Sequence, residues 1–287
     1  MKVTKYLLLI LISLGCSLSV AGRPVSIRIG SYNLRMQQLD KGENDWSVRK
    51  SRVMQSIEDN AFDVFGLQEL TEFAQDDLRE ALGKKYQFIF FSPYSQDGVG
   101  GRAQGIAFDR KRFKLVEYHY FWPSDTPEVM NVNDHHAGHT YKRGAACCVL
   151  ADRKNHGKKI FVMNCHAPLG REDHFNSSHV YVDVEKKYNP DGLPSFFVGD
   201  FNARPDHPST LYFQTYWKDS AITRGCADKS TFNSFSTDPS AWDVECRRID
   251  YIYYRNIGDP VKYECNRTLY DALPASDHFP VWADFVY

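Results

Sequence analysis

Acidic, amide and imidazole side chains recur along this chain where apolar, strand-like runs begin or end. The residues of this kind are Asn33, Glu69, Asp200, Asn202, Asp277 and His278. Carboxylate and amide oxygens are the ligands that a hard cation such as Mg²⁺ prefers, and a cation beside an imidazole suits a phosphate group. Delivered together from several strand ends, these side chains predict metal-assisted chemistry on a phosphate.

The acidic members of this set each have a second interpretation. Glu69 follows a buried run at 64–68, so its carboxylate either binds a cation or caps the next helix. Asp200 and Asn202 stand two residues apart, and an extended chain would point both side chains the same way. Gly199 would let the backbone approach a ligand closely. The alternative for Asp200 and Asn202 is an Asx-type turn.

His278 and its neighbour Asp277 would point in opposite directions from a regular strand, so both can serve one site only from a loop. Asp250 lies between apolar residues, and a buried acid needs a partner. His278 is the natural one, because a carboxylate behind an imidazole fixes its tautomer and favours its protonated form. The alternative for Asp250 is a salt bridge with Arg247 or Arg248.

Two further residues are candidates for contact with a phosphate. His166 ends the strand-like run 160–165 and precedes Ala167 and Pro168, which would leave the imidazole at the mouth of a strand. Its alternative is a structural histidine. Arg143 precedes the run at 145–150, and its guanidinium fork suits a phosphate; its alternative is a surface ion pair.

Strand-like and helix-like patterns alternate along the chain. Apolar runs predict strands at 25–32, 63–68, 86–91, 104–109, 113–121, 145–150, 160–165, 195–198, 249–254 and 281–285. Apolar stripes predict helices near 48–61, 72–82, 172–188 and 208–216, the second of them capped by Thr71. This mixture favours two packed sheets with helices outside.

Composition and termini place the chain among exported globular proteins. It has 287 residues with 43% hydrophobic and 14% aromatic residues, enough to bury a core, and no linker divides it. Lys2 and Lys5 precede an apolar run at 6–12, and small residues at 19–21 offer a cleavage site. We therefore expect a secretory signal peptide at 1–21 and one domain at 22–287, periplasmic or secreted. The alternatives are lipid attachment at Cys16, which would anchor the protein at the cell surface, and a membrane anchor.

Charge and cysteine content limit the partners and the redox state. The net charge of −1 provides no positive field for tight, sequence-independent binding to long DNA, although a nuclease acting locally stays compatible with it. No feature calls for an obligate protein partner, so a monomer is expected. Disulfides persist in exported proteins, and we expect one between two of Cys226, Cys246 and Cys265.

Six short pieces of this sequence, in order, resemble the endonuclease/exonuclease/phosphatase superfamily. They are Ser31-Tyr32-Asn33, Leu67-Gln68-Glu69, Asn164-Cys165-His166, Gly199-Asp200-Phe201-Asn202, Arg248-Ile249-Asp250-Tyr251 and Ser276-Asp277-His278-Phe279-Pro280. The resemblance spans nearly all of the chain after residue 21. It implies an α/β fold, a four-layer sandwich of two mixed β-sheets packed face to face and flanked by helices. It also implies a magnesium-dependent phosphoesterase with its site at the shared mouth of the sheets.

The resemblance implies two groups of site residues. One holds Mg²⁺, with Mn²⁺ as the alternative, and consists of Glu69 as chief ligand assisted by Asn33 and Asp277. The other is catalytic and consists of His166, Asp200, Asn202, Asp250 and His278. Asp200 and Asn202 would hold the attacking water and the phosphate, while His166 would donate to the phosphate or the leaving oxygen. His278 oriented by Asp250 would be the general base, although the proton could instead go to Asp200.

Departures from the superfamily's sequence pattern reduce the number of expected substrate classes only partly. Leu70 and Thr71 follow Glu69 where abasic-site repair enzymes usually carry a lysine, so that activity is not expected. The prediction is nuclease-like hydrolysis of phosphodiester bonds. Its alternative is a phosphatase or a sphingomyelinase-like phosphodiesterase acting on an inositol phosphate or a phospholipid head group. The substrate partner is therefore a phosphate ester: a nucleic acid, nucleotide, inositol phosphate or phospholipid.

Two other classes of protein compete with this prediction. A catalytically inactive binding module would need a lost ligand, and none of the key positions is lost. A zinc hydrolase would recruit His135, His136 and His139, but these lack the helical spacing of such sites.

Overall fold

The structure is a computed structural model that describes residues 24–130, 142–169 and 171–287. The predicted signal peptide at 1–21 lies outside the described residues, and so do Cys16 and the alternative zinc ligands His135, His136 and His139. None of the helices in the described part has the length and apolarity needed to cross a membrane.

The described chain folds into two mixed sheets of six strands each. The first has the order β11-β12-β1-β2-β4-β3 and the second the order β5-β6-β7-β8-β10-β9. The strands of the first sheet are β1 (Ser26–Asn33), β2 (Val64–Leu70), β3 (Tyr86–Phe91), β4 (Ala103–Asp109), β11 (Lys262–Cys265) and β12 (Val281–Val286). Those of the second are β5 (Phe113–Phe121), β6 (Gly144–Asp152), β7 (Lys158–His166), β8 (Ser195–Asp200), β9 (Lys218–Asp219) and β10 (Asp250–Arg255). One pair in each sheet is parallel, β1 with β2 and β7 with β8, and the other pairs are antiparallel.

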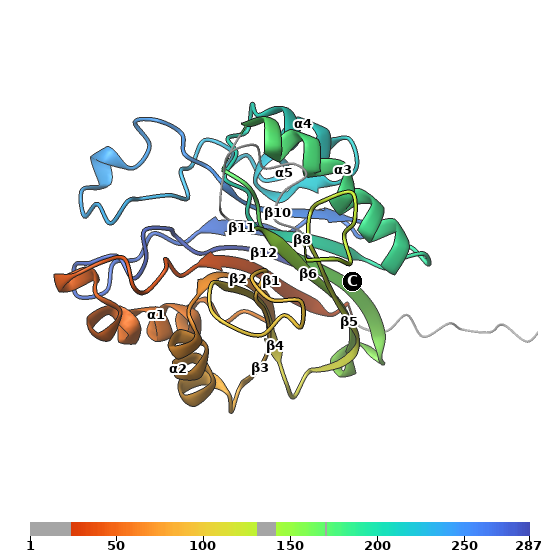
Figure 1. The fold of residues 1–287 in the computed structure, drawn as a ribbon, viewed down its shortest axis with the longest axis horizontal. Helices are drawn as coiled ribbons and strands as arrows, with labels where there is room; N and C mark the ends of the chain where they lie inside the picture. Colours follow the sequence, from red (N-terminus) through yellow and green to blue (C-terminus); the bar gives the residue numbers. More distant parts are fainter. Residues whose placement is uncertain (1–23, 131–141, 170) are drawn as a thin grey trace, which may run out of the picture.

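Helices cover the outer faces of the two sheets (Figure 1). The α-helices are α1 (Trp46–Asn60), α2 (Glu72–Leu82), α3 (Arg171–Tyr188), α4 (Pro208–Gln214) and α5 (Ser220–Thr223). Short 3-10 turns lie at Gly42–Asn44, Arg153–Asn155 and Pro239–Ala241. Apolar residues of α1 and α2 pack on the first sheet, and those of α3 and α4 on the second. The predicted α/β four-layer sandwich is therefore confirmed.

The core between the sheets is aliphatic and aromatic. Ile29, Val64 and Ile106 of the first sheet meet Val162 and Val198 of the second, all fully buried. Because two sheets stack face to face at about 10 Å, their inner side chains interdigitate and fix how the strand ends of one sheet lie against those of the other.

Three elements were not predicted from the sequence: β9, β11 and α5. Each is four residues or shorter, and a segment of that length shows no readable apolar period. Among the described strands β11 pairs with β12 alone and lies at the edge of its sheet, where one of its side chains, Tyr263, is buried.

The expected disulfide is not present. Cys226, Cys246 and Cys265 are free thiols in this structure, as are the remaining cysteines of the described residues. Cys265 is held in β11 and its Sγ lies 3.5 Å from the carbonyl oxygen of Ser230, while Cys226 and Cys246 contact other carbonyl groups. The sequence placed all three in the loop-rich C-terminal third, but sharing a region does not bring two sulfur atoms within bonding distance.

Candidate active site

Strand ends from both sheets meet at one edge of the sandwich and carry the predicted site residues there. Asn33 ends β1 and is paired with Gln68 of the parallel strand β2, one residue before Glu69. His166 ends β7 opposite Asp200, which ends the parallel strand β8. Asp250 begins β10 opposite Asp200 on the other side. Parallel strands deliver their carboxyl ends to the same edge, which explains the convergence.

Glu69 reaches the site through an irregularity in β2. The register between β2 and β4 shifts between Leu67 and Leu70, and Glu69 has a φ of 63°. A left-handed backbone at a glutamate is strained and is found mostly where the surrounding structure enforces it. The carboxylate accepts from the backbone N–H of Met36 at 2.7 Å. Thr71, not Glu69, caps α2, so the helix-cap alternative for Glu69 is wrong.

Asn33 connects the two sheets at the centre of the cluster. Its Nδ2 donates to Asp200 Oδ2 at 2.8 Å and to Glu69 Oε1 at 3.2 Å, and the side chain is fully buried. Its Oδ1 accepts from the backbone N–H of Arg35. The amide nitrogen therefore faces the carboxylates, and Asn33 would have to turn its amide by half a rotation to offer its oxygen to a cation.

His278 is held by Asp250, as the sequence predicts. The distance from His278 Nδ1 to Asp250 Oδ2 is 2.9 Å, and both side chains are buried. His278 Nε2 lies 3.7 Å from Asp200 Oδ2 and 4.0 Å from Asp277 Oδ1. Asp277 and His278 lie in an irregular segment before β12, which is the loop that the sequence required.

The alternative partners of Asp250 are used elsewhere. Arg248 forms a fully buried ion pair with Asp219 at 2.7 Å, and Arg247 contacts Glu245 at the surface. The salt-bridge interpretation of Asp250 is therefore wrong. A threonine supports the carboxylate instead, because Thr231 Oγ1 donates to Asp250 Oδ2 at 2.6 Å.

Burial and neighbouring charges shift the pKa values of this cluster. Burial alone would lower the pKa of His278, but the charges of Asp250, Asp200 and Asp277 outweigh it and hold that pKa well above its usual value. Burial raises the pKa of Asp200 to about 7, because the His278 charge only partly offsets the loss of water and the Asp250 charge adds to it. Burial also raises the pKa of Asp277. These groups therefore hold protons at neutral pH more firmly than exposed ones do.

His166 lies between a carboxylate and a guanidinium. Its Nε2 is 3.4 Å from Asp200 Oδ2, and Arg143 Nη1 lies 3.0 Å from its Nδ1. Because a guanidinium is only a donor, Nδ1 must accept, which places the proton of the neutral ring on Nε2. Burial first, and then the charges of Arg143 and His278, hold the pKa of His166 well below its usual value. His166 is therefore a neutral donor at the site.

Asn202 and Gly199 differ from the sequence expectation. β8 ends at Asp200, Asn202 has a φ of 48°, and its backbone N–H donates to Asp200 Oδ1 at 2.9 Å. The alternative, an Asx-type turn, therefore forms, and the idea of two side chains pointing the same way from an extended chain is wrong. Asn202 Nδ2 donates to the Ala167 carbonyl. At Gly199, with a φ of 148°, a Cβ would lie 2.2 Å from the Cys165 carbonyl oxygen, so this glycine allows a close approach to β7 and not to a ligand.

The donor set suits a divalent cation. One ligand atom from each of Glu69, His166 and Asp200 lies within 4.8 Å of the others, and Asp200, Asp250 and His278 form a second such group. The carboxylates are the ligands to consider, because His166 carries its proton on Nε2 and His278 Nδ1 faces Asp250. Asp277 contacts the same region through His278. Carboxylate oxygens at this density fit a hard cation such as Mg²⁺, whose charge would offset their mutual repulsion.

Several residues of the site had not been given a role from the sequence. Arg35 Nη1 lies 3.6 Å from Asp277 Oδ2, and Ser276 Oγ donates to the Asn33 carbonyl. Thr231, which holds Asp250, lies in the connection before β10. Arg35 and Ser276 adjoin residues that the sequence had marked, and this adjacency was the available signal. Thr231 has no such signal, because a loop shows no apolar period.

A cavity of about 200 Å³ opens beside Glu69 and His166. Its polar lining includes Arg35, Tyr94, Arg102, Gln104, Lys142 and Arg143. We call it the active-site cavity. Arg143 thus faces the site rather than forming a surface ion pair, although its role at a phosphate stays a prediction.

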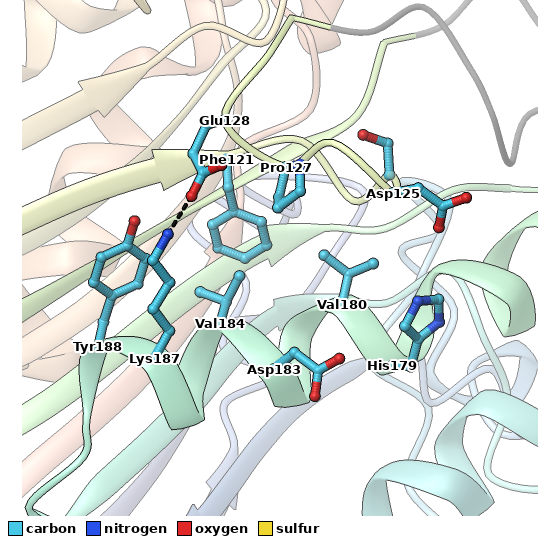
Figure 2. Close-up of a pocket in the computed structure, with 11 residues that line it drawn as sticks. Phe121, Asp125, Pro127, Glu128, His179, Val180, Asp183, Val184, Lys187 and Tyr188 are labelled. Atoms are coloured by element: carbon cyan, nitrogen blue, oxygen red, sulfur yellow. Dashed lines mark hydrogen bonds and ion pairs between the residues drawn. The ribbon is translucent and has the colours of Figure 1, made fainter.

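A second cavity, of about 270 Å³, lies away from the site residues between α3 and the segment that follows β5. Figure 2 shows its apolar floor of Phe121, Val180 and Val184 and the ion pair of Glu128 with Lys187 at one end. None of the predicted site residues lines it, whereas Glu69, His166 and Arg143 line the active-site cavity.

The fold and the site together define a class: two-sheet α/β sandwiches that gather carboxylates, amides and histidines at one edge and hydrolyse phosphate esters. The chain belongs to the endonuclease/exonuclease/phosphatase family, whose model matches residues 30–278. The resemblance to this superfamily in the six sequence pieces is thus confirmed. A comparison with curated proteins gives no significant match.

Solved structures of similar fold cover nearly the whole chain. An endonuclease/exonuclease/phosphatase family protein from Bacteroides thetaiotaomicron is 25% identical, with a TM-score of 0.80, over 92% of this chain and 99% of that one. A mannosyl-6-phosphatase from B. thetaiotaomicron VPI-5482 is also 25% identical, with a TM-score of 0.76, over 91% and 99%. TDP2 of D. rerio, complexed with a single-strand DNA product, is 18% identical, with a TM-score of 0.70, over 91% and 98%.

Proposed function

We propose that this protein is a divalent-metal-dependent phosphoesterase that hydrolyses a small phosphorylated molecule by in-line attack of water. The observation that carries the proposal is the cavity of about 200 Å³ directly beside Glu69 and His166, with Arg35, Arg102, Lys142 and Arg143 in its lining. Pockets for drug-sized ligands run from roughly 300 Å³ upward, so this one suits a small ester. The similarity to a mannosyl-6-phosphatase supports the same choice.

This choice favours the phosphatase alternative over nuclease-like hydrolysis, which was the first prediction from the sequence. The near-neutral net charge also supports it, because a polymer of phosphates is usually bound by an extended positive surface. Hydrolysis of a phosphodiester remains the competing prediction and is tested in the same experiment.

The cation would be held by Glu69 and Asp277, with Asn33 after its amide turns. Mg²⁺, or Mn²⁺ as the alternative, would neutralise charge on the phosphate oxygens. We propose that Asp200 and Asn202 position the attacking water and the phosphate, and that the water gives its proton to the pair of Asp200 and His278. Their atoms are 3.7 Å apart, so a proton can pass between them, but His278 can take one only in its neutral form, which its raised pKa disfavours at neutral pH.

The remaining site residues would contact the leaving group or orient the imidazole of His278. His166, neutral and with its proton on Nε2, would donate a hydrogen bond to a phosphate oxygen or to the leaving oxygen. Arg143 would add a charged donor on the same side. Asp250 would act as a positioning residue, because it contacts the ring nitrogen of His278 that points away from Asp200.

We further propose that the protein is exported and works as a monomeric domain of residues 22–287, with lipid attachment at Cys16 as the alternative form of export. The basic residues and apolar run at 2–12 support this. Cell fractionation and mass spectrometry of the mature N-terminus would test it. A cytosolic chain that keeps its first residues would contradict it.

The central experiment is a hydrolysis screen of the purified 22–287 chain. Sugar phosphates, inositol phosphates, nucleotides, sphingomyelin, DNA and RNA are compared with Mg²⁺, with Mn²⁺ and with a chelator. We expect metal-dependent release of phosphate from small esters and little cleavage of polymers. A preference for DNA or RNA would favour the nuclease-like prediction, and hydrolysis that resists the chelator would overturn the proposal.

A further inference from the structure

We propose that the active-site cavity holds a second anion-binding subsite, formed by Arg102 and Lys142 beside Tyr94, and that the substrate is therefore a small phosphate ester with a second anionic group. This second group is a phosphate or a carboxylate. The inference rests on the proposed function, because it places the scissile phosphate at Glu69 and His166.

The charge balance of the cavity is the first observation. Among the described residues that line it, Glu69 is the only acid, whereas Arg35, Arg102, Lys142 and Arg143 are all basic. The positive charge in this lining is therefore greater than one scissile phosphate beside a divalent cation would need.

Two of these basic residues are already engaged. Arg35 pairs with Asp40 at 3.1 Å and with Asp277 at 3.6 Å. Arg143 donates to His166. These two side chains therefore belong to the hydrolytic cluster and its support.

The other two basic residues have no carboxylate partner among the described residues, and both contact Tyr94. Arg102 Nη1 donates to Tyr94 Oη at 3.1 Å and its Cζ lies 5.2 Å from the ring centroid. The backbone N–H of Lys142 donates to the same oxygen at 3.3 Å, and its Nζ lies 6.0 Å from the ring centroid. Arg102 is exposed, and the Lys142 ammonium also lies 3.5 Å from Met130 Sδ. An anion that enters the cavity beside Tyr94 would therefore meet two cations that no described carboxylate neutralises.

The backbone at Arg102 adds to this. Its φ of 52° is left-handed, a conformation that costs a non-glycine residue free energy and collects at binding sites. The residue sits directly before β4, in the turn that follows Gly100 and Gly101. This backbone strain at Arg102 supports a role for its side chain in binding a ligand.

The test compares probes that differ only in the second anionic group. Fructose 1,6-bisphosphate is compared with fructose 6-phosphate, and 6-phosphogluconate with glucose 6-phosphate, all with Mg²⁺. The first pair reports a second phosphate and the second pair a carboxylate. For at least one pair we expect kcat/KM to be at least tenfold higher for the doubly anionic member.

Variants then assign the preference to the subsite. In Arg102→Ala and Lys142→Ala the ratio of kcat/KM between the two members should fall by about 10- to 100-fold, mainly through KM, since a hydrogen bond to a charged group contributes about 1.5–3 kcal/mol. The matched control is Lys159→Ala, an exposed lysine near the start of β7, at the opposite end of the strand from His166. It should leave both rates unchanged. Equal rates for both members of each pair, or a ratio that both variants leave unaltered, would overturn the subsite.

A binding measurement separates this proposal from the proposed function. Calorimetry with the Glu69→Gln variant should give a dissociation constant for the preferred doubly anionic probe at least tenfold below that for its singly anionic partner, and Arg102→Ala in that background should remove the difference. Hydrolysis of the single phosphates without any preference refutes the subsite alone. A complete lack of hydrolysis with retained preferential binding refutes the hydrolase and keeps the subsite.

Discussion

At the scale of single residues, the site depends on buried groups that fix one another. His278 is oriented through Asp250, Asp250 through Thr231, and Asn33 joins Glu69 to Asp200 across the two sheets. A buried charge that loses its partner is costly, so each of these groups is held in one arrangement. Substitutions here should therefore act as units and not one by one.

The carboxylate of Glu69 is the most direct test of metal dependence. Glu69→Gln keeps the shape of the side chain but removes the charge that would hold a divalent cation. Its amide can accept only one of the two hydrogen bonds that the carboxylate accepts from Asn33 and Met36. We expect phosphate release to fall by about 100-fold or more while the melting temperature stays within a few degrees of the native value. Full activity of Glu69→Gln, or native activity in excess chelator, would contradict the metal assignment.

The pair of His278 and Asp250 should show strong non-additivity. His278→Ala and Asp250→Ala should each lower kcat by about 100-fold or more, and the double variant should be little worse than His278→Ala, because an orienting residue has nothing to orient once the base is gone. Circular dichroism would check that each variant folds. If the losses multiply in the double variant, Asp250 is a structural acid and Asp200 becomes the candidate to take the proton.

At the scale of elements, the contact between β2 and β7 places the site. Asn164 of β7 donates to the carbonyl groups of Leu67 and Gly105 in the opposite sheet, and it accepts from Gln68 Nε2 at 2.7 Å. Gly66 makes room for this, since a Cβ there would lie 2.3 Å from Asn164 Oδ1. The sheets are therefore joined by hydrogen bonds directly beneath the catalytic cluster.

Gly66→Ala should test this junction. The added methyl group must displace Asn164 or Val198, and overpacking of a buried site is destabilising by about 1–3 kcal/mol. We expect the free energy of unfolding in urea to fall by that amount and the hydrolysis rate to fall as well. Gly258→Ala is the control, because no atom lies within 4 Å of its added methyl group. Equal stability of the two variants would show that the close approach is unimportant.

At the scale of the whole molecule, the sequence predicted the features that follow a regular spacing of apolar residues, namely most strands and their ends. Alternating apolar runs located most strands, and polar residues at their ends located Glu69, Asp200 and His166, because parallel strands share an edge. It missed what depends on irregular backbone, such as the bulge at Glu69 and the left-handed turn at Asn202. The cavity was missed for a related reason, since Tyr94, Arg102 and Lys142 come from loops or strand edges that carry no period.

Acid stability should depend on one buried histidine outside the catalytic cluster. His174 of α3 is 1% exposed, and its Nε2 contacts the Phe201 carbonyl just after β8. Burial lowers its pKa to about 4, the effect of the carbonyl being smaller and the His207 charge acting in the same direction as burial. An unfolded histidine has a pKa near 6.5, so below that pH the unfolded chain binds the proton and the folded one does not. The contribution of neutral His174 to stability is therefore complete above about pH 6.5 and is lost as the pH falls toward 4.

His174→Gln should remove this dependence, because the amide can still donate to the Phe201 carbonyl but does not titrate. The loss attributable to His174 between pH 7 and pH 4 is about 2–3 kcal/mol. Asp200, Asp277 and His278 titrate as well, so the quantity to compare is the difference in unfolding free energy between the native protein and the variant. Urea unfolding at pH 7, 5.5 and 4.5 should show that difference moving in favour of the variant as the pH falls. Two parallel stability curves would mean that His174 is already protonated in the folded protein, with its positive charge accommodated between α3 and the end of β8.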